Sequence, residues 1–512
     1  MNLLKNIRPV LIITGVLLLL FSCKKDLTEL NVNPDQPLST NPDYLFCYVL
    51  QQGMGNYNSD VTLKQWAIEN WIMYLAARNG FEPGKAYVIP GGKDDFWREQ
   101  YTNTLANTQL IIDMANHNPE MVNIKSAAVI WKVRTFQMIT DLWGDVPYSS
   151  ALQGMSTLAF TPAYDQQQDI YRAMIEELQE AVSAFDPGKK FFASGSDIIF
   201  NGDVEKWKAL GNSLLLRVAT RMNKVDYQTY ANVVENLKGK PLISDNNGTA
   251  VLRYNSVAKN HLWETMYRNE STVQNNPSDF FVKLMVNSND PRIHIFFEKA
   301  PLSFLPFIPS YKGVPNLLPE NDPAWENYNL NADLGVEGEW GDVSRIGKWF
   351  LNNNTPGVVM AWSEVCFLKA EAALNGLLDE DAGVLLAQGI RANMEFFNLY
   401  SDESNRISES EINEYLLQLP EVNLEQIIVQ KWISFAYEQG YDAYAEYRRT
   451  GYPVLKNYQN QPVNPAAFPR RITYPYSEFT LNRDNYNKAI ETQGPDNEFT
   501  RVWWDMNEST VK

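Results

Sequence analysis

Apolar residues recur every three to four positions along most of this chain, which is the spacing of an amphipathic α-helix. In the stretch 165–184, for example, Ile170, Met174 and Leu178 form one apolar stripe. The same spacing predicts further helices over 63–78, 95–115, 124–142, 203–223 and 362–376, and in a segment that begins near Asn423. Because helical periodicity dominates, we expect a mostly α-helical fold.

Polar residues and one glycine mark where two of these helices begin and end. Asp165 and Gln168 have the three-residue spacing of a capping box, and so do Asn423 and Gln426. Gly440 follows the apolar positions of the later helix, and glycine is frequent just beyond a helix C-terminus. The sequence therefore predicts helix starts at Asp165 and Asn423 and a helix end at Gly440.

The pattern changes between about 241 and 360, where proline, glycine, asparagine and aromatic residues become dense. Loops of this length are uncommon unless they have a function. We therefore predict a helical scaffold that is split in sequence by a large, irregular, loop-rich insertion. Pairs of helices are typical of tetratricopeptide-like stacking, although no strict 34-residue consensus is present.

The N-terminus has the order of a secretory signal peptide. Lys5 and Arg8 precede an apolar run from Val10 to Phe21, which is too short to span a bilayer. The run ends in Leu20-Phe21-Ser22-Cys23, which resembles the bacterial lipoprotein cleavage box. We predict a signal peptide over 1–22, lipidation of Cys23, a polar tether over 23–43 and one helical domain over 44–512. The alternative is an ordinary signal peptide followed by a chance cysteine.

The net charge argues against one class of binding partner, and the cysteine content limits the disulfides that the chain can form. The chain has 44 basic and 61 acidic residues, a formal charge of −17, which argues against nucleic acid because phosphate binding needs clustered Lys and Arg. Beyond Cys23 only Cys47 and Cys366 remain. We expect two free thiols that behave as small hydrophobic groups, with a Cys47–Cys366 disulfide as the alternative.

The chain shows no motif for catalysis. Its three histidines, His117, His261 and His294, lack metal-ligand spacing, and no nucleophile elbow occurs. The segment 341–348 has five residues between its glycines rather than four, so it is interpreted as a loop and not a phosphate site. We expect no cofactor, no metal and no enzyme, although a pair of glycosidase carboxylates remains open because such a pair has no sequence spacing.

Several segments, in order, resemble one family. The run Gly144-Asp145-Val146-Pro147-Tyr148 looks like the Gly-Asp-Val-Pro-Tyr turn of the SusD/RagB nutrient-binding outer-membrane lipoproteins. The other similar segments are Thr161-Pro162 with Tyr164-Asp165, Asn201-Gly202-Asp203 with Lys206-Trp207, Arg217 and Arg221, Asp290-Pro291-Arg292, Glu364 with Glu371, Glu446 with Arg448-Arg449, and Pro469-Arg470-Arg471. These residues look structural, because arginine forks bridge helices and a glutamate such as Glu371 on an apolar helix needs a partner.

The resemblance implies a scaffold of tetratricopeptide-like helix pairs at the cell surface. It also implies a TonB-dependent β-barrel transporter of the SusC type as partner, and an oligosaccharide or, in some members, a peptide as ligand. Family members bind through loops that correspond here to 78–101 and 261–349. The candidate ligand residues are Arg78, Asn79, Tyr87, Trp97, Trp263, Tyr267, Trp325 and Trp340.

Aromatic residues in polar surroundings support this class of ligand, since sugars present apolar ring faces and hydroxyl edges. Trp325 and Trp340 have such surroundings, whereas Trp71, Trp131 and Trp432 recur at helical spacing and are predicted to be core. Trp97 has apolar helical neighbours, so the core is its alternative place. Two other functions remain open: a lipid-anchored, all-helical glycoside hydrolase and a helical scaffold that binds only proteins.

Overall fold

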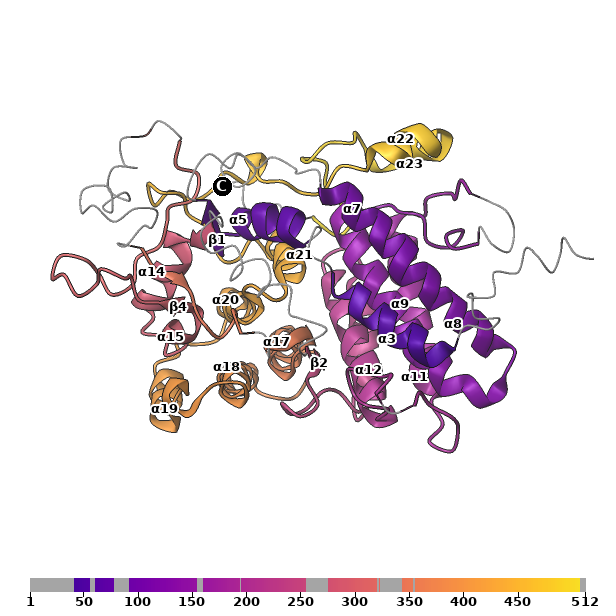
Figure 1. Ribbon diagram of the computed structural model, residues 1–512, viewed down its shortest axis with the longest axis horizontal. Coiled ribbons are helices and arrows are strands. Elements are labelled where there is room, and N and C mark those ends of the chain that lie inside the picture. Colours follow the sequence, from indigo (N-terminus) through magenta and orange to yellow (C-terminus); the bar gives the residue numbers. More distant parts are fainter. Residues whose placement is uncertain are drawn as a thin grey trace, which may run out of the picture.

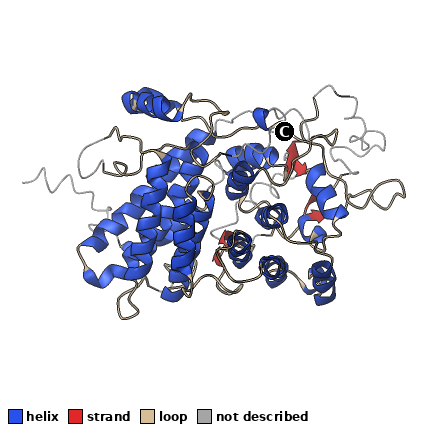
Figure 2. Ribbon diagram, turned by 180° about the vertical axis from the view of Figure 1, so that it is seen from behind, coloured by secondary structure: helices blue, strands red, loops and turns tan. Residues whose placement is uncertain are grey.

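The fold was analysed in a computed structural model that describes residues 41–55, 60–77, 92–153, 160–193, 195–254, 275–319, 322, 343–352 and 355–506. Helices dominate this part of the chain, and the strands are short (Figures 1 and 2). The prediction of a mostly α-helical fold is confirmed.

The elements keep the chain order in which the labels number them. The α-helices are α3 (Pro42–Gly53), α5 (Glu69–Trp71), α7 (Gly92–Glu99), α8 (Ala106–Asn116), α9 (Val122–Trp143), α11 (Gln167–Ala184), α12 (Val204–Arg221), α13 (Tyr227–Leu237), α14 (Asp279–Asn287), α15 (Ile293–Phe296), α17 (Trp362–Leu374), α18 (Ala382–Leu399), α19 (Glu409–Leu417), α20 (Leu424–Phe435), α21 (Gly440–Thr450), α22 (Tyr476–Leu481) and α23 (Arg483–Gln493). The remaining helical turns are η1 (Asp60–Ile68), η2 (Gln100–Leu105), η3 (Pro119–Met121), η6 (Glu403–Asn405) and η7 (Pro465–Ala467). The strands are β1 (Leu75–Ala77), β2 (Ala250–Leu252), β3 (Asn275–Pro277), β4 (Phe297–Glu298), β5 (Arg345–Ile346) and β6 (Gly357–Met360).

The N-terminal half forms a bundle in which α3, α8, α9, α11 and α12 lie side by side (Figure 1). Helix α9 packs between α8 and α11, and α12 packs against α11. The apolar stripe of Ile170, Met174 and Leu178 on α11 is buried, as the sequence periodicity predicts. The predicted core residues Trp71 and Trp131 are also fully buried.

The C-terminal half continues the helix pairing through α17, α18, α20 and α21. Helices α17 and α18 make an especially close pair, because Gly389 lets the ring of Phe367 approach its backbone. A Cβ at Gly389 would lie 2.5 Å from Phe367 Cε1, so a larger residue would push the two helices apart. Close helix pairs of this kind are the tetratricopeptide-like feature that the sequence predicts.

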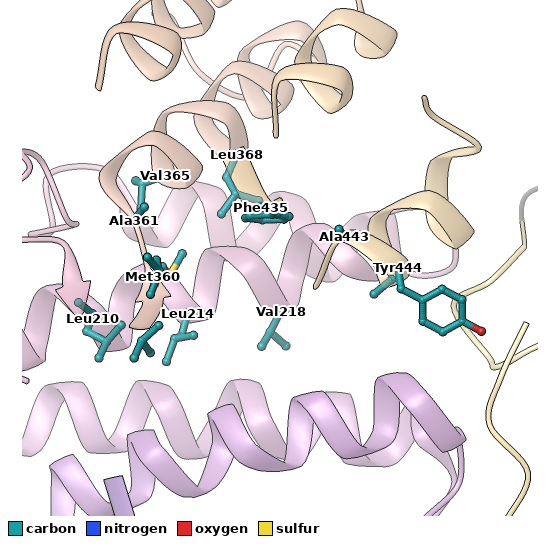
Figure 3. Packing of buried hydrophobic residues seen from close by; sticks show 14 of the residues in the cluster. Leu210, Leu214, Val218, Met360, Ala361, Val365, Leu368, Phe435, Ala443 and Tyr444 are labelled. Carbon is teal, nitrogen blue, oxygen red and sulfur yellow. The ribbon is translucent and has the colours of Figure 1, made fainter. Parts of the chain in front are cut away.

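Apolar side chains join the two halves into one core. Leu210, Leu214 and Val218 of α12 lie in the same buried cluster as Met360 and Val365 of the β6–α17 segment (Figure 3). Each of these side chains has almost no exposure to solvent. The hydrophobic core is therefore continuous across the described helices.

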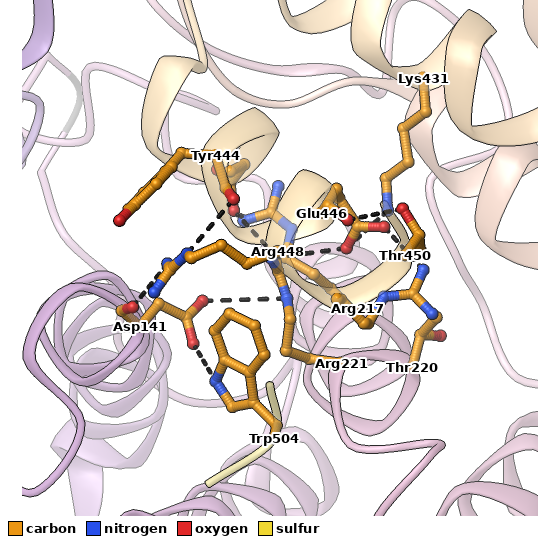
Figure 4. A network of polar contacts seen from close by, with 12 residues as sticks. Asp141, Arg217, Thr220, Arg221, Lys431, Tyr444, Glu446, Arg448, Thr450 and Trp504 are labelled. Atoms are coloured by element: carbon orange, nitrogen blue, oxygen red, sulfur yellow. Dashed lines mark hydrogen bonds and ion pairs between the residues drawn. The ribbon is translucent and has the colours of Figure 1, made fainter. Parts of the chain in front are cut away.

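A network of buried charges lies beside this core (Figure 4). Arg217 of α12 donates two hydrogen bonds to Glu364 of α17, at 2.7 and 2.6 Å. Arg449 of α21 likewise donates to both oxygens of Glu371, at 2.6 and 2.7 Å, and also to Glu446. Since these side chains come from α12, α17 and α21, the network fixes the three helices against one another.

Electrostatics keep this network ionised. Burial by itself raises the pKa of Glu446, but Arg449, Lys431 and Arg221 oppose it more strongly and hold that pKa well below its ordinary value. Arg448 instead donates to backbone carbonyls, at 2.6 Å to Asp141 and 2.8 Å to Arg470. The interpretation of these arginines as structural residues is confirmed.

Three helix predictions need correction. The helix predicted over 63–78 ends at Trp71, because Met73 has a φ of 60° and the chain then enters β1. Asp165 does not cap α11; its carboxylate accepts hydrogen bonds from the backbone of Tyr148 and Ser149 instead. Gly440 begins α21 rather than ending α20, which stops at Phe435.

The predicted insertion, as far as it is described, contains two helices and short antiparallel sheets. Strand β1 pairs with β3, β2 with β6, and β4 with β5. Helices α14 and α15 lie between β3 and β4. Strand β1 lies outside the insertion, so the β1–β3 pairing ties the insertion to the scaffold, whereas the β2–β6 and β4–β5 pairings join segments within it.

Two smaller expectations are also decided. The capping box at Asn423 and Gln426 is present at the start of α20. Cys47 and Cys366 are free, so the disulfide alternative is wrong.

Within the described ranges, none of the helices combines the length and the apolar character that crossing a membrane requires.

Candidate functional site

The loops predicted to bind ligand, 78–101 and 261–349, lie partly outside the described residues, which leave out 78–91, 261–274 and 323–342, but the described residues that flank these stretches are well placed. Strand β1 ends at Ala77, directly before 78–91, and β3 begins at Asn275, directly after 255–274. Ala77 and Asn275 are partners in one antiparallel sheet. The residues that flank these two stretches therefore lie side by side at one end of the sheet.

Another described residue that flanks an undescribed stretch lies at the same place. Val343, which follows the stretch 323–342, forms a small buried cluster with Ala76 and Val314. The Asn276 amide donates to the Ser344 carbonyl at 3.0 Å, and the Asn316 amide donates to the Leu75 carbonyl at 2.7 Å. We call the β1–β3 sheet with residues 314–316 and 343–344 the loop anchor.

The candidate residues divide into two groups. Seven of them lie outside the described residues: Arg78, Asn79, Tyr87, Trp263, Tyr267, Trp325 and Trp340. Trp97, on α7, is described and is only 6% exposed. Its ring centroid lies 5.2 Å from that of Trp143 and 4.9 Å from that of Tyr101. A ring enclosed in this way has no free face for a sugar, so Trp97 belongs to the core.

A cavity of about 480 Å³, which we call the α14–α20 cavity, opens next to the loop anchor. Pro315 and Asn316 of the anchor form one wall, and Phe280 and Leu284 of α14 form the next. The far wall comes from Val429 of α20 and from the segment 453–460. Sequence reasoning missed this cavity; the Pro- and Tyr-rich composition of the tail 453–490, which begins with this segment, is the one signal that points to it.

A second cavity of about 480 Å³ lies on the other side of α14. Met285 and Val286 of α14 line it together with Tyr311, and Glu411 and Glu414 of α19 stand at its edge. Glu411 also closes the capping box of α19 by accepting from Ser408. This carboxylate is therefore already used in holding the helix.

The ionisable side chains of the described residues do not gather into a metal site. No group of three or more His, Cys, Asp or Glu side chains among them could hold a metal ion. In the α14–α20 cavity, Asp279 is paired with Lys283 at 2.6 Å. Two of the three histidines, His117 and His294, are described, and they lie on different helical segments.

Comparison with protein families identifies the class to which this helical scaffold belongs. A family model described as SusD-like, starch-binding and associating with the outer membrane matches residues 34–475. The chain therefore belongs to the SusD-like family. Among curated protein sequences, none matches this chain.

Solved structures give the same fold. A chitin-binding protein is 26% identical, with a TM-score of 0.78, over 91% of this chain and 100% of its own. A chitin-binding SusD homologue from Flavobacterium johnsoniae is 24% identical, with a TM-score of 0.72, over 91% of this chain and 98% of its own. A SusD homologue from Bacteroides fragilis is 22% identical, with a TM-score of 0.76, over 91% of this chain and 100% of its own.

Proposed function

We propose that this protein is a non-catalytic, lipid-anchored surface protein that captures oligosaccharides and delivers them to a SusC-type, TonB-dependent transporter in the outer membrane. The observation that carries the proposal is the loop anchor, because Ala77, Asn275 and Val343, each of which flanks an aromatic-containing stretch of the sequence, lie close together there. Peptides are the second ligand class. The chitin-binding relatives support a carbohydrate.

The binding surface would combine the segments 78–91, 255–274 and 323–342 around the loop anchor. Trp263, Tyr267, Trp325 and Trp340 would offer ring faces to sugars, and Arg78 would offer a planar donor fork. Rigid attachment matters here, since a binding loop held by a scaffold loses less freedom when the ligand binds. The sheet pairing of Ala77 with Asn275 supplies that attachment.

Direct titration tests the binding function. Calorimetry of the intact protein against a panel of starch, chitin and other oligosaccharides should give saturable binding to one class. The same panel should yield no new reducing ends after prolonged incubation. Robust release of sugars would instead support the glycoside hydrolase, and binding to proteins alone would support the helical scaffold.

Lipidation of Cys23 is part of the proposed mechanism. A lipid anchor would keep the binding body at high effective concentration above its transporter. The variant Cys23→Ala should therefore abolish growth on the captured glycan while the purified protein keeps its affinity. Normal growth of that strain would show that the anchor is unnecessary. Copurification of a TonB-dependent transporter with the native protein tests the partner.

A further inference from the structure

The family comparison assigns no ligand to the α14–α20 cavity, but the residues that line it indicate one. Phe280, Leu284, Val429, Pro315 and Pro453 give it an apolar floor. Phe280 and Tyr458 are both partly exposed, so ring surface faces the open space. A concave, apolar floor with aromatic walls is the usual form of a small-molecule site.

The rim of the cavity is polar but electrically balanced. Two carboxylates, Asp279 and Glu425, are matched by two ammonium groups, Lys283 and Lys456. Asp279 and Lys283 already pair at 2.6 Å, one turn apart on α14. A ligand with its own charge would have to compete with that pair, whereas a neutral ligand can hydrogen-bond to both members.

Amide side chains complete the rim. Asn287 and Asn460 are exposed at the cavity edge, and each carries both donors and acceptors. Sugar hydroxyls also donate and accept, and the ring of a pyranose has an apolar face. The floor and the rim therefore complement the two surfaces of a sugar.

We propose that the α14–α20 cavity is a subsite for one unit of a neutral, uncharged glycan. The inference rests on the proposed carbohydrate-binding function and adds to it a place and a ligand class. The apolar face of the sugar packs on Phe280 and Tyr458, and its hydroxyls bond to the rim. Because the wall at Asn316 is hydrogen-bonded to β1, the subsite is continuous with the loop anchor.

The same observations disfavour other occupants. An acidic glycan, with uronic acid or sulfate groups, meets two carboxylates, Asp279 and Glu425, and finds Lys283 already paired, which leaves Lys456 as the other cation among the residues that line the cavity. It also approaches a chain with a formal charge of −17. A neutral ligand feels neither effect, so its binding should depend little on salt.

Two variants test the subsite without cutting into the core. Tyr458→Ala removes a ring from the wall, and Asn287→Trp fills the cavity from an exposed position. Tyr476→Ala, an exposed tyrosine on α22, is the matched control. Calorimetry of the full protein should show that each cavity variant binds neutral oligosaccharides about tenfold more weakly, or worse, while the control binds as the parent does. Circular dichroism and melting temperature check that all three are folded.

Salt and ligand charge give an independent readout. We expect the affinity for the neutral glycan to change less than about twofold between about 0.05 and about 0.5 M NaCl. Uronic acid oligosaccharides of the same length should bind more weakly than neutral ones. A preference for the acidic oligosaccharides would overturn the subsite.

The outcomes separate the two proposals. If the parent binds neutral glycans and both cavity variants bind equally well, the subsite is wrong and the carbohydrate-binding function stands. If the parent binds no glycan of any class, the carbohydrate-binding function fails and the subsite fails with it. Weaker binding by both variants, with the control unchanged, supports the subsite.

Discussion

Two regions of this molecule use the same kinds of side chain in opposite ways. In the buried charge network, Arg217 and Arg449 each hold a carboxylate through two hydrogen bonds, and both side chains are at most 2% exposed. In the α14–α20 cavity, the Lys283 side chain is 66% exposed and pairs with a single carboxylate. Charged groups that are saturated inside the protein hold helices together, whereas groups at an open rim remain available to a ligand.

This difference indicates that the family's most regular motifs have a structural role and that ligand-binding residues lie elsewhere. Arg217, Arg448 and Arg449 stand out in the sequence, yet their donors point to Glu364, Glu371 and backbone carbonyls within the protein. The cavity residues stand out much less. The most recognisable residues therefore build the scaffold, and the less recognisable ones surround the open space.

The largest contrast should appear when one partner is removed from each ion pair. Arg449→Met leaves Glu371 and Glu446 buried without their main partner, so we expect it to lower the free energy of unfolding by about 3–5 kcal/mol. Lys283→Met breaks an exposed pair and should cost at most about 1 kcal/mol. Urea denaturation measures both. Equal losses in the free energy of unfolding would show that the buried network and the cavity rim contribute to stability in the same way.

Trp97 tests the border between core and site. Trp97→Ala should lower the free energy of unfolding by about 3–5 kcal/mol, because it removes a buried ring that contacts Trp143 and Tyr101. Glycan affinity of the folded variant should stay at the parental value. Lost affinity with unchanged stability would return Trp97 to the ligand site, as the sequence first indicated.

Acid should weaken the network through Glu446. Its pKa is held below that of an unfolded glutamate, so its contribution is complete above about pH 4.3 and is lost as the pH falls below that value. We expect Glu446 to account for a loss on the order of 2 kcal/mol in acid. Asp141 acts in the opposite direction, since burial raises its pKa.

The Glu446 contribution can be isolated with Glu446→Gln. This variant should be less stable than the parent at pH 7, and its stability should fall less steeply between pH 5 and pH 3. Parallel curves for the two proteins would show that Glu446 does not titrate in this way. Denaturant midpoints at each pH provide the measurement.

Trp325 and Trp340 sharpen the other side of the comparison. Each change to alanine should weaken glycan binding by about 1–3 kcal/mol, the size of a stacking anchor, without lowering stability by a similar amount. Calorimetry and thermal melts on the same samples separate the two effects. Unchanged affinity would remove that tryptophan from the site.

The smallest expected effect is that of a reducing agent on the two cysteines of the helical scaffold. Cys47 and Cys366 are free, so a reducing agent should leave the melting temperature unchanged. Burial raises the pKa of Cys366 to about 12, and iodoacetamide should therefore label Cys47 first. A melting temperature that falls with reductant would reveal a disulfide.

Much of the scaffold follows from the sequence because helix periodicity is a local signal. The stripe of α11 and the capping box of α20 involve neighbours in the chain, and both are confirmed. Long-range contacts override local signals in other places. Asp165 has the spacing of a cap, but it accepts hydrogen bonds from the backbone of Tyr148 and Ser149. Trp349 lies in the loop-rich region of the sequence, yet it is buried and its indole donates to the Phe397 carbonyl.

The sequence by itself determined the helical scaffold, the family and the structural role of the arginines, because each depends on spacing or on an ordered set of motifs. Only the tertiary structure decided that Trp97 is core and that Ala77, Asn275 and Val343 lie close together at one anchor. It also showed that α14, α20 and residues 453–460 enclose a cavity. These features join residues far apart in the chain, and their proximity arises from packing rather than from any local pattern.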